Sequence, residues 1–263
     1  MAELTFELNV LRSQIRYQLT LLARNPRALM TALVLPAMIL ALELGKVQHL
    51  GSTPTGMAVL APRIAGLFVF GATAIALMSH ALSLVVARED GMLRRWRASP
   101  LPPATYFAAK IIATVLAADV AGVVLVALSV EMAKLHLTAH AAVAMLVAST
   151  LGALALAAVG TAITALIPTS QGAQPVLMFI YLPLVFLSGS FGPNSNLPHW
   201  LTTAVTYLPV QPIIDAVSNG LIGNGGSLVP MHDLLVLAGW LLVGLVASLL
   251  FFRWDPSRPR HAR

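Results

Sequence analysis

Residues 141–167 read AAVAMLVASTLGALALAAVGTAITALI, a run without a single charged side chain. A helix of roughly 20 apolar residues crosses the hydrocarbon core of a bilayer, which is about 30 Å thick. The whole chain has the same character, because 58% of its 263 residues are hydrophobic and only 10% are charged. A soluble fold with so few charges would expose apolar patches far larger than monomers normally carry. The run therefore predicts a spanning helix in an integral membrane protein.

Outward from this run, further apolar stretches are long enough to span a membrane or nearly so. They cover residues 28–44, 64–86, 109–130, 171–190 and 234–252. The first is short, and the stretch at 171–190 spans only if its polar start at residues 171–174 joins the helix. We expect an all-α polytopic membrane protein with six transmembrane helices, or five as the alternative. Residues 1–263 should form a single transmembrane domain, with residues 28–252 as its six-helix bundle.

The basic residues predict the orientation. Thirteen of the sixteen Lys and Arg residues fall within residues 1–27, 87–110 and the tail 253–263, all on one side of the predicted membrane. The other three fall on the opposite side: Lys46, Arg63 and Lys134. By the positive-inside rule both termini are cytoplasmic, in a plasma (inner) membrane. This asymmetry accounts for the net charge of +6, so we expect no nucleic-acid partner.

The first 27 residues predict an amphipathic helix that lies on the membrane surface. Apolar residues recur at spacings of three and four, which places them on one face: Leu8, Leu11, Ile15, Leu19 and Leu22. Polar residues form another face: Asn9, Arg12, Arg16 and Thr20. A frayed tail with accidental periodicity is the alternative.

The long external connection, residues 191–233, contains no Lys or Arg. A turn precedes a short helix with Pro198 near its start, Pro209 and Pro212 break that helix, and residues 213–222 resume a mostly apolar one. We expect a re-entrant or interfacial helical hairpin, which lipid tolerates only where the loop backbone is buried in protein or hydrated.

Two polar residues, His80 and Asp119, fall inside predicted spans. A carboxylate in the middle of a span costs at least a few kcal/mol and should face the bundle interior. Asp119 either carries protons or binds a cation, or it forms hydrogen bonds with Ser, Thr or His on a neighbouring helix or is simply protonated. His80 is a candidate partner. Small residues at every fourth position, Ala144, Ala148 and Gly152, predict a close helix contact.

Enzyme functions are poorly supported. The chain has no Cys, and its seven His residues lack metal-ligand spacing. No phosphate-binding loop of the form GxxxxGKS or GxxxxGKT occurs. An intramembrane hydrolase that pairs Ser188 or Ser190 with His80 would lack a nucleophile elbow and a third member. We therefore expect no metal site and no nucleotide hydrolysis by this chain.

Two stretches resemble a known family. Residues 86–102, VAREDGMLRRWRASPLP, resemble the first cytoplasmic loop of ABC-2 type transporter permeases. Residues 183–191, PLVFLSGSF, followed by LPHWL at 197–201 and YLP at 207–209, resemble the family signature around the fifth span and the external hairpin. The similarity covers nearly the whole chain.

The resemblance implies a permease subunit of an ATP-driven exporter, nearest to the drug and antibiotic branch. A second permease chain, identical or different, and a separate ATPase dimer that uses ATP and Mg²⁺ would complete it. A coupling helix would dock on the ATPase through Arg88, Glu89, Asp90, Gly91, Arg94, Arg95, Trp96, Arg97 and Pro100. The resemblance around the hairpin implies that four residues belong to it: Gly189, Pro198, Pro209 and Asp215.

Alternatives remain open at this point. The cationic segment at residues 86–102 would also suit anchoring on anionic lipid. Within the family, the main competing function is export of polysaccharide or glycolipid. Outside it, a stand-alone proton-coupled carrier would use Asp119 and His80, and a membrane-embedded enzyme is the third class. A self-sufficient carrier needs no docking helix, which favours the permease.

Overall fold

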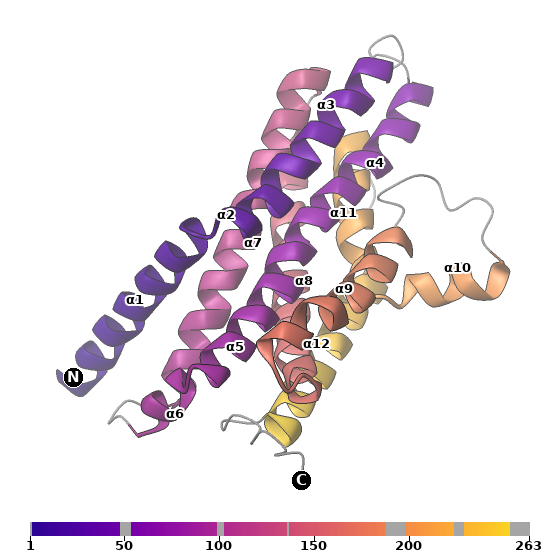
Figure 1. The fold of residues 1–263 in the computed structure, drawn as a ribbon. Helices are drawn as coiled ribbons and strands as arrows, with labels where there is room; N and C mark the ends of the chain where they lie inside the picture. Colours follow the sequence, from indigo (N-terminus) through magenta and orange to yellow (C-terminus); the bar gives the residue numbers. More distant parts are fainter. Residues whose placement is uncertain are drawn as a thin grey trace.

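The computed structural model describes residues 2–47, 54–98, 103–135, 137–187, 198–223 and 229–252. Within these ranges all regular structure is helical and there is no strand. The long helices run roughly side by side along one axis (Figure 1). A helix satisfies its backbone hydrogen bonds within its own segment, as lipid requires. The predicted all-α class is confirmed.

The chain folds into twelve α-helices and three short π or 3-10 segments within the described residues. In order they are α1 (Ala2–Ala23), α2 (Pro26–Leu29), η1 (Met30–Val34), α3 (Leu35–Val47), α4 (Pro54–Thr73), η2 (Ala74–Ser79), α5 (His80–Glu89), α6 (Met92–Arg97), α7 (Pro103–Ala133), α8 (Ala139–Ile163), η3 (Thr164–Leu166), α9 (Ser170–Leu187), α10 (His199–Thr206), α11 (Gln211–Ile222) and α12 (Met231–Phe251).

Five helices in the described ranges are long and apolar enough to cross a membrane: Ala58–Glu89, Thr105–Ala133, Ala139–Leu166, Ser170–Leu187 and Met231–Phe251. The first predicted span coincides with a shorter apolar helix, Met30–Glu43. The chain is nevertheless helical without a break from Pro26 to Val47, a length of about 33 Å. The polar residues 171–174 join α9, as spanning by that helix requires.

Pro36 interrupts the backbone hydrogen bonds of the helical segment from Pro26 to Val47. Proline has no N–H, so the carbonyl four residues earlier, that of Ala32, loses its helical donor. The preceding segment η1 is π-helical, a distortion common where the helical hydrogen-bond ladder is interrupted. Gly71 of α4 lies against this carbonyl, and a Cβ at that position would come within 2.3 Å of the Ala32 oxygen. Glycine at position 71 therefore permits the close approach of α4 to η1.

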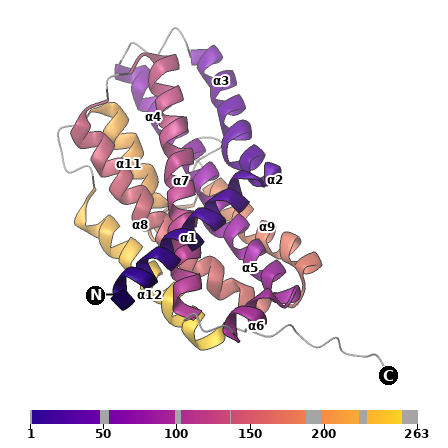
Figure 2. The ribbon, with the colours of Figure 1, turned by 90° about the vertical axis from the view of Figure 1, so that its left-hand side faces the viewer.

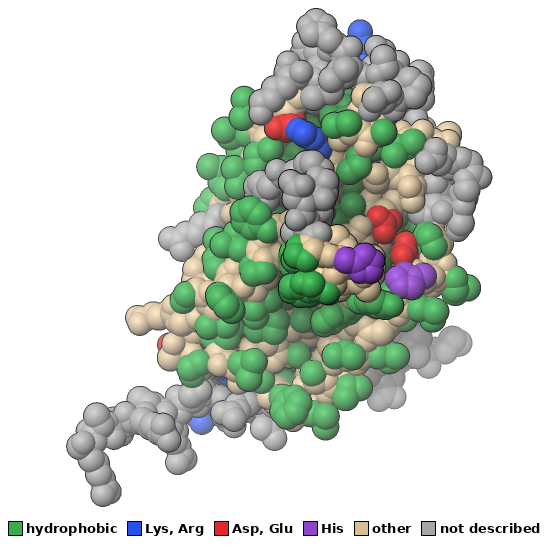
Figure 3. All heavy atoms as spheres, turned by 90° about the vertical axis from the view of Figure 1, so that its right-hand side faces the viewer, with side chains coloured by type: hydrophobic (Ala, Val, Ile, Leu, Met, Phe, Trp, Pro, Cys, Tyr) green, Lys and Arg blue, Asp and Glu red, His purple; other side chains and the backbone are tan. Residues whose placement is uncertain are grey.

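Burial differs strongly among the spans. The continuous segment α4–η2–α5 is the most buried of the five, and α12 is the most exposed. Large apolar side chains cover much of the outside, and Phe179 and Leu249 are 81% and 84% exposed. Hydrophobic side chains occupy most of the described part of one face (Figure 3). Such a surface matches lipid rather than water.

Helix α1 packs against α7 at the end of the bundle that carries α6 (Figures 1 and 2). Leu11 and Ile15 are partly buried, whereas Arg12 and Arg16 are exposed. The two predicted faces of this amphipathic helix are therefore present. Its contact with a membrane surface stays a prediction.

Within the described residues 198–223, the chain forms two helices that differ in burial. The short helix α10 begins after Pro198 and lies across the direction of the long helices (Figure 1). After a turn with a buried Pro209, α11 returns into the bundle against α4 and α8. On the predicted small-residue face of α8, Gly152 lies against Ile213 of α11, whose Cδ1 atom would be 2.3 Å from an added Cβ. Gly189 lies outside the described residues.

Candidate functional site

The turn after α5 fixes the position of α6. Gly91 adopts a left-handed backbone with φ of 68°, a conformation that glycine adopts at little steric cost. On α6, Leu93 is fully buried and packs in a cluster with Leu84, Ala87 and Tyr106. Helix α6 is thus attached to α5 and α7 by apolar packing, so its orientation relative to the bundle is defined.

Arg88 and Glu89 connect the end of α5 to the turn between α8 and α9. Arg88 is only 2% exposed, and its guanidinium donates to the carbonyl oxygens of Thr164, at 3.0 Å, and Ile167. The Glu89 carboxylate accepts a hydrogen bond of 2.7 Å from the backbone N–H of Ser170, the first residue of α9. The predicted coupling loop included both residues, but in the structure the Arg88 side chain is buried inside the bundle.

The exposed residues at this end include Asp90, Arg94 and Arg95. The Arg95 guanidinium donates to the Asp90 carbonyl oxygen at 3.2 Å. Trp96 and Arg97 belong to α6, but their side chains and Pro100 lie outside the described part of the chain. Helix α6 therefore presents arginines at the end of the bundle where α1 begins and α12 ends (Figure 1).

His80 joins three helices through two threonines. Its Nδ1 and Nε2 atoms each lie 3.0 Å from a hydroxyl, that of Thr114 on α7 and that of Thr161 on α8. The Thr161 hydroxyl donates to the carbonyl of Ala157, so it accepts from His80 Nε2–H. This network assigns Nε2 as a donor, and the direction of the bond between Nδ1 and Thr114 follows from the tautomer. Both ring nitrogens of His80 are thus used within the bundle. Ser188 and Ser190, the residues of the hydrolase alternative, lie outside the described residues.

Asp119 binds hydroxyls on the neighbouring helix. Ser149 donates to one carboxylate oxygen at 2.6 Å, and Thr150 donates to the other at 2.8 Å. The expected bonding to Ser or Thr is confirmed, whereas His80 as the partner is wrong. The reason is geometric: His80 faces Thr114, and Asp119 lies about 7.5 Å further along α7 and on a different face.

Asp119→Asn is expected to weaken the α7–α8 contact only modestly. Asparagine has one oxygen acceptor in place of two, so one of the two hydroxyl bonds is lost, and interhelical hydrogen bonds in membranes average about 0.6 kcal/mol each. We expect a loss of about 1 kcal/mol in stability and a small fall in transport. Thermal unfolding in detergent and a transport assay check this. Complete loss of transport, with uptake driven by a pH gradient without ATP, would instead support a proton carrier.

A cavity of about 320 Å³ lies between α7 and α8 beside this carboxylate. Asp119 and Ser149 are its only polar side chains in the described chain, and the other lining residues include Phe68, Val126 and Met145. This lining suits a ligand in which an apolar group lies next to a hydrogen-bonding group.

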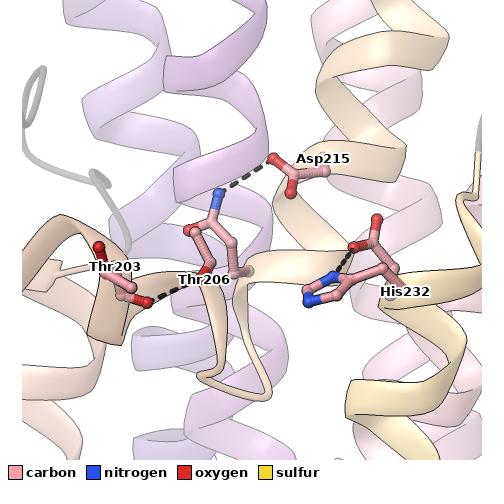
Figure 4. A network of polar contacts seen from close by, with 6 residues as sticks. Thr203, Thr206, Asp215 and His232 are labelled. Atoms are coloured by element: carbon pink, nitrogen blue, oxygen red, sulfur yellow. Dashed lines mark hydrogen bonds and ion pairs between the residues drawn. The ribbon is translucent and has the colours of Figure 1, made fainter.

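Local polar contacts lie near the base of the hairpin (Figure 4). Gln211 donates to an Asp215 oxygen at 3.0 Å, and His232 Nδ1 lies 3.3 Å from Asp233. Burial is the main cause that raises the pKa of Asp215, and the nearby Asp233 adds to it, while the Gln211 bond opposes it. Gln211 and Asp215 lie one turn apart, so this bond is a contact within α11.

The sequence pattern contained a signal for Arg88 that the motif obscured. Ala81, Leu84, Val85 and Arg88 recur at spacings of three and four, so they share a helical face, and all four are buried. The threonines that bind His80 had no such signal, because isolated Thr residues are common in apolar helices.

A family model for ABC-2 type transporters matches residues 10–222, which is most of the chain. The matched region includes α6, α10 and α11. None of the curated proteins compared with the chain matches it. The chain therefore belongs to the ABC-2 type transporter family, whose members are the transmembrane components of ABC transporters and work with a separate ATPase.

Proposed function

We propose that the chain is the permease subunit of an exporter that moves an amphiphilic or lipophilic, drug-like substrate outward. Two permease chains pair, and a separate ATPase dimer binds ATP and Mg²⁺. The six-helix count includes the helix from Pro26 to Val47, and both termini are cytoplasmic. The arrangement of α6 carries this proposal, because an exposed arginine-bearing helix is rigidly attached to the bundle.

The attachments of α6 suggest how ATPase closure would reach the spans. Leu93 ties α6 to α5 and α7. At the adjacent end of α5, Arg88 and Glu89 bind the turn between α8 and α9. A displacement of α6 would therefore move α5 and bias the α8–α9 turn. Coupling requires such a two-state element that the partner binds differently in its two states.

The lining of the α7–α8 cavity supports a lipophilic substrate over a glycan. A sugar chain presents many hydroxyls, each of which needs a hydrogen-bond partner when buried. The described lining offers only Asp119 and Ser149. Polysaccharide or glycolipid export is therefore less well matched by this site.

Charge reversal on α6 tests the docking. With Arg94, Arg95 and Arg97 all changed to Glu, the chain should insert normally but lose its ATPase, because a cationic surface becomes anionic. The measurement is affinity purification of the chain co-expressed with its ATPase, identified among neighbouring reading frames by a phosphate-binding loop. We expect at least a tenfold lower recovery of the ATPase.

The matched control reverses three other arginines of the chain, Arg258, Arg260 and Arg263, in the C-terminal tail. This variant changes the net charge equally and should retain the ATPase. Normal copurification and export by the α6 variant would show that α6 is not the docking element.

A further inference from the structure

A second cavity, of about 330 Å³, lies between α1, α5 and α7 near the end of the bundle that carries α6. Its volume is at the lower end of the range of about 300–1,000 Å³ for small-ligand pockets. Its wall includes both polar and apolar side chains, among them Asn25, Ser79, Leu21, Val86 and Lys110. It is separate from the α7–α8 cavity beside Asp119.

Lys110 is the unusual member of this wall. It is only 6% exposed, and its ammonium makes no hydrogen bond or ion pair within the described part of the chain. The ammonium lies over the ring of Tyr106, whose centre is 5.9 Å from Nζ. A buried charge without a partner is costly, and folded proteins normally pair such groups. The described chain therefore supplies no anion to pair with Lys110, and a bound ligand could provide one.

The other titratable groups around the cavity do not fill this role. His80 is held by Thr114 and Thr161, and Tyr106 shares a hydrogen bond with Gln18. Asp90 also lines the cavity, but its side chain is exposed and forms no ion pair with Lys110. Tyr17 is likewise on the exposed side, at 49%.

The remaining wall fits an amphiphile with an anionic head. Ser79 and the amide nitrogen of Asn25 donate to no acceptor within the described ranges, so they are available to oxygen atoms of a ligand. Leu21 and Val86 are 46% and 38% exposed, which gives the cavity an apolar border. A phosphate group would pair with the ammonium and accept from the neutral donors, since charge-assisted bonds of this kind are the strong ones.

We propose that this cavity binds the phosphate group of an anionic phospholipid from the leaflet nearest to α6, with Lys110 as its cationic contact. The acyl chains lie outside, along the apolar border. Binding here needs only the membrane-embedded chain and depends neither on the ATPase nor on the direction of transport.

The test is thermal unfolding of the full chain in detergent, titrated separately with phosphatidylglycerol, phosphatidylcholine and inorganic phosphate. Phosphatidylglycerol should raise the Tm of the wild type at lower concentrations than phosphatidylcholine, and inorganic phosphate should have little effect. Lys110→Met should lower the apparent affinity for phosphatidylglycerol at least tenfold, because the charge-assisted contact is lost.

Two variants keep the test independent of folding. Lys110→Met should have an unchanged or higher Tm without added lipid, since it removes an unpaired buried charge. Lys134→Met is the matched control, because Lys134 is exposed beyond the far end of α7, and it should respond to phosphatidylglycerol as the wild type does. Unchanged affinity in Lys110→Met, or a Tm that falls equally with and without lipid, would overturn the proposal. Equal stabilisation by inorganic phosphate would overturn the assignment to a lipid.

Discussion

Arg88→Met is expected to lower the stability of the chain by about 2–4 kcal/mol, because the buried guanidinium is the donor for two carbonyl oxygens at the end of α8. Methionine matches the length of the side chain but donates nothing, so the carbonyls of Thr164 and Ile167 are left buried without this partner. For a chain of this size the Tm should fall by about 5–10 °C.

Thermal unfolding of the purified variant in detergent measures this effect. Arg95→Met is the matched control, because Arg95 lies on the next helix, α6, where it is exposed, and should change the Tm little. Arg88→Lys should recover only part of the loss, since an ammonium cannot reproduce the forked geometry of a guanidinium. If Arg88→Met unfolds at the same temperature as Arg95→Met, the link between α5 and the α8–α9 turn does not hold these helices together.

Gly244→Ala is expected to separate α12 from α8. A Cβ at this position would lie 2.7 Å from the backbone nitrogen of Val159 and 2.8 Å from the carbonyl carbon of Ala158. These are backbone atoms, so no change of rotamer relieves the clash. Overpacking of this kind costs about 1–3 kcal/mol, and Gly244→Leu should cost more and reduce the yield of folded protein.

Gly239 provides a control on the same helix. A Cβ there has no neighbour within 4 Å, so Gly239→Ala should be neutral or stabilising by up to about 1 kcal/mol, the gain in helix propensity. Both variants replace Gly by Ala on α12, so the difference between their Tm values excludes the effect of helix propensity and reports the packing clash. Equal Tm values for Gly244→Ala and Gly239→Ala would contradict the close α8–α12 packing.

The fold class could be predicted because a bilayer leaves few choices. Residues 141–167 are too apolar and too long for any element but a spanning helix, and the structure has a helix from Ala139 to Leu166. The first span was harder to delimit, since the helix from Pro26 to Val47 includes Pro36 and the π-helical η1. Local sequence cannot show where neighbouring helices will accept such a distortion.

The candidate site was only partly predictable. The charged segment correctly predicted a short helix with exposed Arg94 and Arg95. It gave Arg88 the same outward role, because the motif orders residues along the chain and not around the helix. His80 was one candidate partner of Asp119 because both lie in predicted spans. In the structure, however, each binds threonine or serine hydroxyls at a different depth in the bundle. Which side chains pair across two helices depends on how the helices are shifted along their axes relative to one another. The sequence of a single span does not specify this shift.

We propose above that this chain is a permease that moves substrate only when a separate ATPase drives it. The most direct measurement is uptake or release of a lipophilic fluorescent cation by proteoliposomes that contain the purified chain, either alone or with its ATPase and MgATP. We predict no transport by the chain alone, with or without a pH gradient, and ATP-dependent transport by the complex. Sustained transport by the chain alone would contradict the account.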